Sequence, residues 1–134
     1  MEVEKILARP RRIRARMEEQ RERVDRLEAF AQRCTSSWSE TPCGHGGDAR
    51  YDAVAKLVEE RKKLLGLAAS YQDALWAVND LIERLPKERM RQAVKLRALD
   101  ELSWRKAGRE MGISPRSARR WYIRAVAGLS KKNP

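Results

Sequence analysis

The chain has 134 residues, a length typical of one domain or of a small domain with a long appendage. Charged residues make up 37% of it, aromatic residues only 6%, and the net charge is +11, which favours elongated, solvated helices over a compact globule. No apolar run is long enough to cross a bilayer, and residues 1–20 lack the apolar core of a signal peptide, so we expect a cytoplasmic protein without a membrane partner.

The positive charge is concentrated in the last third of the chain. Residues 87–134 contain 14 Lys and Arg against four acidic residues, whereas residues 1–86 contain 16 against 15. A region of mixed sign followed by a strongly basic one is typical of a scaffold joined to a module that binds a polyanion. A solvated basic surface without any partner explains the charge equally well, so the residue pattern has to decide.

The first predicted helix carries a coiled-coil seam. Apolar and small residues recur from Ile13 at alternating steps of four and three, with one polar position at Gln20. Pro10 fits poorly inside a helix, so we expect the helix to begin near it, or residues 1–9 to form a separate turn. The predicted seam consists of Ile13, Met17, Gln20, Val24, Leu27, Ala31 and Cys34.

Residues 35–50 collect Ser, Thr, Pro and Gly without an apolar period, which predicts a loop. Cys43 and His45 lie close together in this segment, and Cys34 precedes it. Structural zinc sites use paired ligand hooks and a fourth ligand, which this spacing does not provide. We therefore expect free thiols and no metal or other cofactor. The ring of Trp38 is expected to anchor the loop on the helices, and a contact with a partner is the alternative.

A second seam follows the loop and predicts a helix of ~30 residues that pairs with the first as an antiparallel hairpin. Its one charged position, Arg61, is tolerable if the guanidinium reaches solvent. Apolar surface that the hairpin leaves uncovered is available to a second copy of the chain or to the C-terminal module. The predicted seam is Val54, Leu57, Arg61, Leu64, Ala68, Tyr71, Leu75, Val78, Ile82 and Leu85.

Leu85-Pro86 interrupts the pattern, and three shorter helices are predicted after it. The first covers residues 87–99, the second lies between Ser103 and Gly112, and the third runs from Ser114 to about Leu129. Ser is a favourable N-cap, Gly a favourable C-terminal stop and Pro a favourable first helical residue. We therefore predict an all-α fold in which a long antiparallel helical hairpin, residues 1–84, precedes a small helix-turn-helix domain, residues 85–134.

The stretch from Ser103 to Tyr122 supplies the parts that a helix-turn-helix needs. Gly108 is a small residue for a close crossing of the two helices, and Gly112 tolerates a left-handed turn. Ile113 and Ala118 have the spacing of a hydrophobic staple. Trp104 is expected to cover the helix interface. The apolar residues expected to lock the pair together are Ala107, Met111, Ile113, Ala118 and Trp121.

The residues left on the outer side of the third helix are of the types that bind DNA. Arginine forms bidentate hydrogen bonds with guanine and also neutralises phosphate, while Ser hydroxyls and helix N-terminal amides hold the backbone. We therefore predict double-stranded DNA as the partner of this face. The candidate residues are Ser114, Arg116, Ser117, Arg119, Arg120 and Arg124, with Arg105, Lys106 and Arg109 of the preceding helix as candidates for phosphate contacts.

The segment LPKERMRQAVKLRALDELSWRKAGREMGISPRSARRWYIRAVAGL, residues 85–129, resembles the helix-turn-helix of bacterial sigma factor region 4. It is similar, more closely still, to phage and prophage transcriptional regulators of the RinA/ArpU type, in which Ser-Trp opens the first motif helix and an Arg-rich helix follows. The resemblance implies a sequence-specific transcriptional regulator in the cytoplasm of a bacterial host. RNA polymerase, and a second copy bound through the N-terminal helices, are further candidate partners.

Two positions depart from the pattern of those regulators. Ala107-Gly108 stands where a larger apolar residue followed by Ala is usual, and Arg97-Ala98-Leu99-Asp100-Glu101-Leu102 stands where an aromatic residue and a glycine are usual. Both departures imply looser packing rather than lost binding.

Two other functions also fit the sequence. A phage DNA-packaging component similar to small terminase subunits combines an oligomerising coiled coil with a DNA-binding helical module. A protein-interaction module, in turn, would use its basic end to dock an acidic protein surface. An enzyme is not expected, because the chain has a single His, no phosphate-binding glycine loop and no carboxylate cluster with metal-ligand spacing.

Overall fold

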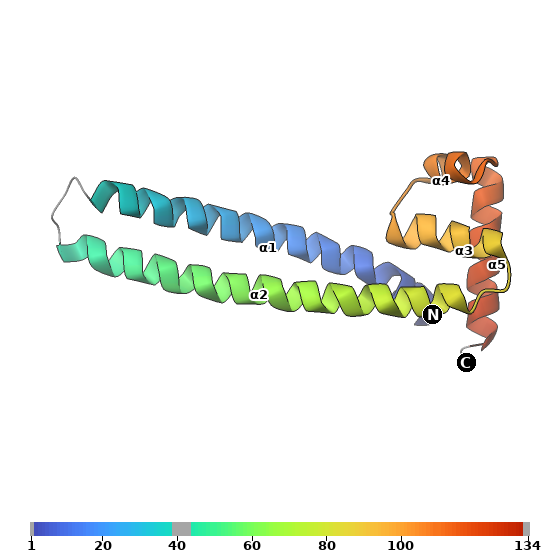
Figure 1. Cartoon of the computed structure of the whole chain (residues 1–134), viewed down its shortest axis with the longest axis horizontal. Coiled ribbons are helices and arrows are strands. Elements are labelled where there is room, and N and C mark those ends of the chain that lie inside the picture. The colour runs from blue at the N-terminus through green and yellow to red at the C-terminus, as the bar shows by residue number, and fades with distance from the viewer. Residues whose placement is uncertain (1, 39–43, 133–134) are drawn as a thin grey trace. The chain divides into compact units, whose positions relative to one another are not determined.

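The computed structural model describes the backbone of residues 2–38 and 44–132, and the side chains of residues 2–33 and 51–131. The described residues form α-helices joined by short connections, with no strand among them, so the predicted all-α fold is confirmed (Figure 1). Two long helices come first and three short ones follow. They are α1 (Glu2–Trp38), α2 (Gly44–Glu83), α3 (Glu88–Val94), α4 (Trp104–Met111) and α5 (Pro115–Lys132), with one π-helical segment, η1 (Lys95–Leu99), after α3.

The chain divides into two compact units. The first, here called the helix-turn-helix unit, joins Met1–Arg14 to Tyr71–Pro134, and the second, the hairpin unit, is Ala15–Ser70. The start of α1 and the end of α2 therefore belong to the same unit as the three short helices. The predicted domains, residues 1–84 and 85–134, are meant as parts that fold independently. The two compact units do not test this, so the division stays a prediction.

Helix α1 runs through Pro10 without interruption, so the prediction of a helix start or a separate turn at this position is wrong. Proline removes one backbone hydrogen bond and costs about 3 kcal/mol in a helix interior. Val3 and Leu7, which precede it, are only 2% and 4% exposed and belong to the largest buried cluster. Burial of two such side chains contributes about 1.5–3 kcal/mol each, enough to keep the helix continuous on both sides of Pro10.

The connection between the long helices is shorter than the predicted loop over residues 35–50. Helix α1 continues to Trp38 and α2 begins at Gly44. Each residue added to an existing helix gains a hydrogen bond, and Ser and Thr lower helix propensity only slightly, so propagation extends both helices beyond their apolar seams. Cys43 lies outside the described residues, as do the side chains of Cys34, Trp38 and His45, and what we expect of the thiols, the metal and the anchor stays a prediction.

In the hairpin unit, α1 and α2 run antiparallel and side by side (Figure 1). On α1 the predicted inner face is confirmed over the described side chains, because Val24 and Gln20 are each 6% exposed and Met17, Leu27 and Ala31 are partly buried. The polar seam position is satisfied: the Gln20 amide donates to the backbone oxygen of Glu60 at 2.9 Å and to the Glu60 carboxylate.

On α2 the seam differs from the prediction at two positions, Val54 and Arg61, whereas the predicted Ala68, Leu75 and Ile82 are partly buried. Leu57 and Leu64 face inward as predicted, but their seam partners are Ala53 and Glu60, while Val54 is 45% exposed and Arg61 is also exposed. The predicted register placed Val54 and Arg61 in the seam instead of their neighbours Ala53 and Glu60. In the structure a small Ala and a hydrogen-bonded Glu hold these positions, which lets the two helices approach and gives Gln20 its partner.

The core of the helix-turn-helix unit combines residues from both ends of the chain. Leu129 of α5 is 2% exposed, and Val78 of α2 and Val94 of α3 are fully buried. These side chains hold α5 against the end of α2. The cluster contains Val3, Leu7, Val78, Leu81, Leu85, Val94, Ala98, Ala125, Val126 and Leu129.

Candidate nucleic-acid interface

The turn between α4 and α5 has the predicted caps. The Ser103 hydroxyl accepts a hydrogen bond from the amide of Lys106 at 3.3 Å, which satisfies one free N–H at the start of α4. Gly112 ends that helix at φ 70°, in the left-handed region that glycine adopts without strain. At the start of α5 the Ser114 hydroxyl accepts from the amide of Ser117 at 3.2 Å. The orientation of α5 is therefore fixed at its N-terminal end.

Gly108 lies where α4 meets the turn, as predicted, and the fit is close. A Cβ atom at this position would come within 2.8 Å of the Ile113 carbonyl oxygen and within 3.0 Å of the Pro115 nitrogen. Both atoms belong to the backbone and cannot move aside as a flexible side chain would. Ala107 and Ala118, on either side of the crossing, are fully buried. The crossing thus depends on the absence of a side chain at residue 108.

Trp104 packs inside the unit, as predicted. Its ring meets Tyr122 of α5 in an edge-to-face arrangement with ring centroids 5.3 Å apart, and the Arg97 guanidinium lies 4.7 Å from the Trp104 centroid. Burial raises the pKa of the Tyr122 phenol above its ordinary value. These contacts fix the start of α4 to the middle of α5.

Like Met111 and Ile113 among the predicted locking residues, Trp121 is partly buried. The Lys87 ammonium lies 5.7 Å from its ring centroid and the Arg124 guanidinium 5.5 Å. Two cations therefore cover the part of the ring that the core does not. When a large aromatic ring lies at the edge of a small core, packing covers one face of the ring and cation–π contacts stabilise the other face.

The segment before α4 contains two features that the sequence did not predict. Residues 95–99 form the π-helical turn η1, and Glu101 adopts φ 54°, which favours glycine. The Glu101 carboxylate accepts a hydrogen bond from the Arg14 guanidinium at 3.1 Å. The regulators that the sequence resembles usually have a glycine in the segment 97–102. The absence of a glycine there was the one sequence feature that pointed to a left-handed residue.

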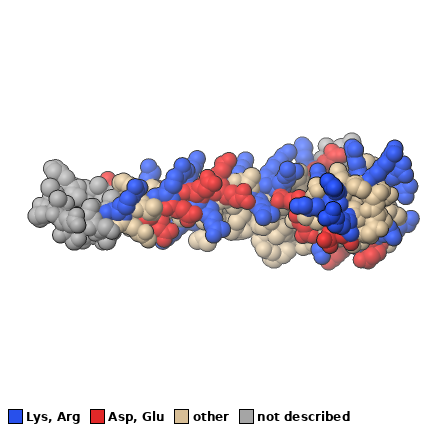
Figure 2. All heavy atoms as spheres, turned by 90° about the horizontal axis from the view of Figure 1, so that it is seen from above, with Lys and Arg blue, Asp and Glu red and all other residues tan. Residues whose placement is uncertain are grey.

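The predicted DNA-binding cations are exposed on α4 and α5. Arg116 and Arg120, four residues apart on α5, share one face of that helix, and Arg119 flanks them. Within the part of the chain that the structure describes, none of the predicted cations forms an ion pair, and six of them also form no cation–π contact with an aromatic ring. They are Arg105, Lys106, Arg109, Arg116, Arg119 and Arg120. Figure 2 shows blue side chains gathered over the region that carries α3, α4 and α5.

The other predicted residues have partners inside the unit. The Ser114 hydroxyl both caps α5 and donates to the Ser117 hydroxyl at 2.9 Å, and Ser117 is partly buried. Arg124 is exposed but lies over the Trp121 ring. Ser114 and Ser117 therefore stabilise the N-terminal end of α5, and Arg124 stabilises the exposed part of the Trp121 ring. Only the polar atoms that these contacts leave unbonded are available to a partner.

Ile123 belongs to the same face and was missed. It is 53% exposed and lies three residues after Arg120 and seven after Arg116, so it shares their side of α5. An exposed β-branched residue among arginines provides the apolar contact that a thymine methyl group requires. Helical periodicity counted from Arg116 would have found it.

Comparison with known families agrees with this geometry. Residues 75–129 match the family model described as Sigma-70, region 4. The C-terminal helices form a helix-turn-helix of the sigma factor region 4 type, which is a DNA-binding module. The match begins inside α2, close to Tyr71, where the second segment of the helix-turn-helix unit begins. No curated protein and no solved structure matches the chain.

The described residues contain neither a candidate membrane-spanning helix nor a candidate metal site. None of the helices there is long and apolar enough to span a membrane. Nor do His, Cys, Asp and Glu side chains in that part of the chain come together in a group of three or more that could hold a metal ion.

Proposed function

We propose that this protein is a sequence-specific regulator of transcription that binds duplex DNA by inserting α5 into the major groove. The observation that carries the proposal is the exposed face of Arg116, Arg119 and Arg120 on a helix whose N-terminus is capped and whose opposite face is locked in the core. Cations on a rigid helix lose little entropy when they bind, and they have no competing ion pair within the described residues to break.

Each cation has a role that follows from its position. Arg116 and Arg120 read base edges, because they project from the middle of the exposed face, and Ile123 adds an apolar contact beside them. Arg119 and Arg124 lie toward the flanks and bind phosphates. Arg105, Lys106 and Arg109 of α4 hold the backbone on the other side of the groove, as the first helix of such a motif does.

The test is selection from a randomised duplex library with the intact chain at ~150 mM salt, where non-specific phosphate attraction is already weakened. The wild type should enrich one motif. The double variant Arg116→Ala/Arg120→Ala should lose it, because each base contact discriminates by about 1–3 kcal/mol. A matched control, Arg16→Ala/Arg21→Ala, removes the same charge from exposed positions of α1 and should select the wild-type motif.

No enrichment by the wild type, with salt dependence equal in all three proteins, would contradict sequence-specific binding. If the double variant still enriched the same motif, residues other than Arg116 and Arg120 would recognise the base sequence.

The proposal includes a dimer joined through the long helices. Val54, Val58 and Leu65 are 45%, 46% and 70% exposed, and their spacing places them along one side of α2, next to its seam. A second copy would cover this apolar surface and present two reading helices to two half-sites. Light scattering of the intact protein should give the mass of a dimer, and a Leu65→Lys variant should be monomeric.

We further propose that the regulator is of the phage or prophage kind and that it contacts RNA polymerase in the cytoplasm of a bacterial host. The sequence resemblance over residues 85–129 supports the first part, and the region 4 type of the helix-turn-helix supports the second. A large closed ring in the light-scattering experiment would favour DNA packaging instead. Co-purification of the intact chain with bacterial RNA polymerase holoenzyme would test the contact.

A further inference from the structure

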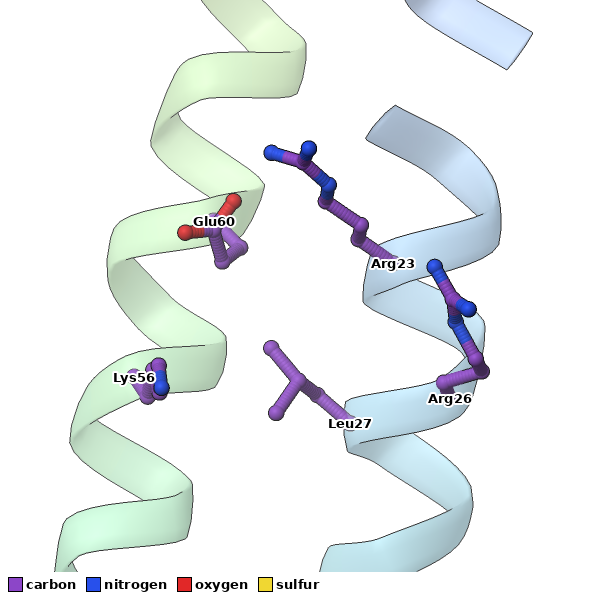
Figure 3. Close-up of a pocket in the computed structure, with 5 residues that line it drawn as sticks. All are labelled: Arg23, Arg26, Leu27, Lys56 and Glu60. Atoms are coloured by element: carbon purple, nitrogen blue, oxygen red, sulfur yellow. The ribbon is translucent and has the colours of Figure 1, made fainter. Parts of the chain in front are cut away.

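The two edges of the hairpin unit differ in how their charges are paired. On one edge the Arg61 guanidinium forms an ion pair with the Glu28 carboxylate across the seam at 3.3 Å. The other edge holds a pocket of about 340 Å³, here called the hairpin groove, between the two helices (Figure 3). It is lined by Arg23, Arg26 and Leu27 of α1 and by Lys56 and Glu60 of α2.

Cations from both helices meet at the hairpin groove. In Figure 3 the Arg23 side chain reaches from α1 toward α2 at the level of Glu60, and Leu27 points between the helices. Glu60 is the one acidic residue in the lining, and its carboxylate already binds the Gln20 amide and, at 3.2 Å, the Lys63 ammonium. These bonds hold the pKa of Glu60 below its ordinary value.

The charge of Arg23 also helps to lower the pKa of Glu60, whereas Arg26 and Lys56 have no such carboxylate in the lining. Arg23, Arg26 and Lys56 are exposed, and no ion pair of theirs occurs among the residues whose side chains are described. Like charges on facing helices of an antiparallel pair repel, so this arrangement does not stabilise the hairpin itself. An external anion is the component that would make it favourable.

The groove also has an apolar part. Leu27, the apolar residue of the lining, is partly buried, and Phe30, which lies one turn further along α1 and outside the lining, is 45% exposed. A phosphate placed against these apolar side chains would lose its hydration without gaining hydrogen-bond donors. An apolar side chain flanked by carboxylates would cover Leu27 and would also pair with the cations around it.

The wider charge distribution also favours a protein over a nucleic acid. Residues 1–86 contain 16 Lys and Arg against 15 acidic residues, so this part of the chain has no strong long-range attraction for a polyanion. The lining of the groove, in contrast, contains three cations and one carboxylate. A local match of charge and shape is what a short protein segment recognises.

We propose that the hairpin groove binds an acidic, amphipathic segment of a partner protein, whose apolar side chain covers Leu27 and Phe30 and whose carboxylates pair with Arg23, Arg26 and Lys56. This site goes beyond the DNA-binding function and does not depend on it. It gives the hairpin unit a recruiting role of its own.

The test is selection from a display library of randomised helical peptides on the intact chain. Peptides with Asp or Glu on either side of an apolar residue should be enriched. A synthetic peptide of the enriched sequence should then bind an Arg23→Ala/Lys56→Ala variant about tenfold more weakly than the wild type. Its affinity for an Arg21→Ala/Lys62→Ala control, which removes the same charge from other exposed positions of the two helices, should stay within about twofold.

Circular dichroism of the three proteins should show equal helix content, which separates lost binding from lost folding. Failure to enrich acidic and apolar sequences, or equal binding by both double variants, would overturn the proposal. So would a loss of duplex DNA affinity in Arg23→Ala/Lys56→Ala as large as that in Arg116→Ala/Arg120→Ala, since the groove would then serve phosphates. Because the selection uses no DNA, its failure would leave the DNA-binding proposal standing.

Discussion

The helix-turn-helix unit and the hairpin unit are both helical, but different interactions define them. In the helix-turn-helix unit Val78, Val94, Ala107, Ala118 and Ala125 are fully buried, and serine caps fix the N-terminal ends of α4 and α5. In the hairpin unit the most buried of the described side chains keep a few per cent of their surface, and Gln20 bonded to Glu60 lies in the seam. A rigid core suits the precise presentation of a reading helix, whereas a thin seam leaves most of each helix surface open to partners.

The largest contrast should appear when a core leucine is truncated in each unit. Leu129→Ala removes a side chain that is 2% exposed, and we expect it to lower the free energy of unfolding by about 3–4 kcal/mol. Leu64→Ala, at a partly buried seam position, should cost about 1–2 kcal/mol. Urea denaturation followed by circular dichroism measures both. Equal losses would mean that the two interiors do not differ as described.

The same substitution at two glycines should have opposite signs. At Gly108 a Cβ would meet backbone atoms at 2.8 and 3.0 Å, so Gly108→Ala should cost about 2–3 kcal/mol. Gly66 is exposed inside α2, and a Cβ added there would meet open space, so Gly66→Ala should gain about 1 kcal/mol from helix propensity. Denaturation midpoints compare them directly. A stabilising Gly108→Ala would show that α4 and the turn are not closely packed.

These contrasts also separate what the sequence could predict from what it could not. The caps at Ser103 and Ser114, and the roles of Gly108 and Gly112, were predicted correctly because local chemistry determines them. The α2 seam was predicted one residue off at Val54 and Arg61, because periodicity alone does not show which of two adjacent residues a partner helix covers. The bond between Gln20 and Glu60 that favours the observed register joins residues 40 positions apart.

Tertiary context explains the remaining differences. The continuity of α1 through Pro10 depends on burial of Val3 and Leu7 against residues from α2 and α5, which local pattern cannot predict. The π-helical turn and the left-handed Glu101 have no propensity signal of their own. The exposed arginines of α5 were predicted from periodicity, and the DNA contacts assigned to them stay a prediction.

A smaller effect is expected where α3 and α4 are joined. Glu101→Gly removes the cost of a left-handed conformation at a residue with a side chain, about 1 kcal/mol, and gives up an exposed ion pair with Arg14 that contributes little. The variant should therefore be more stable by a few tenths to about 1 kcal/mol. Arg14→Ala, which removes the ion pair and leaves the residue at position 101 unchanged, is the control. A less stable Glu101→Gly would mean that the pair, rather than the backbone, dominates at this position.

The smallest effect concerns the polar seam of the hairpin unit. The Gln20 amide, followed by Lys63, lowers the pKa of Glu60, so the stability that this carboxylate contributes is present above its unfolded pKa of about 4.3 and is lost as the pH falls through its folded pKa. Gln20→Leu should raise the folded pKa and weaken this acid dependence. An NMR titration of the Glu60 carboxyl measures the change. An unchanged pKa would show that the neighbouring cations, Lys63 and Arg23, control the group.

The central claim is that α5 reads base edges rather than merely attracting DNA. The most direct measurement is the ratio of affinities for the selected duplex and a scrambled duplex of the same length, at one salt concentration, for the wild type and for Arg116→Ala/Arg120→Ala. We expect a ratio of about 10³ or more for the wild type and a collapse by about 100-fold in the variant, with much smaller loss on the scrambled duplex. An equal loss of affinity on both duplexes, leaving the ratio unchanged, would contradict the account.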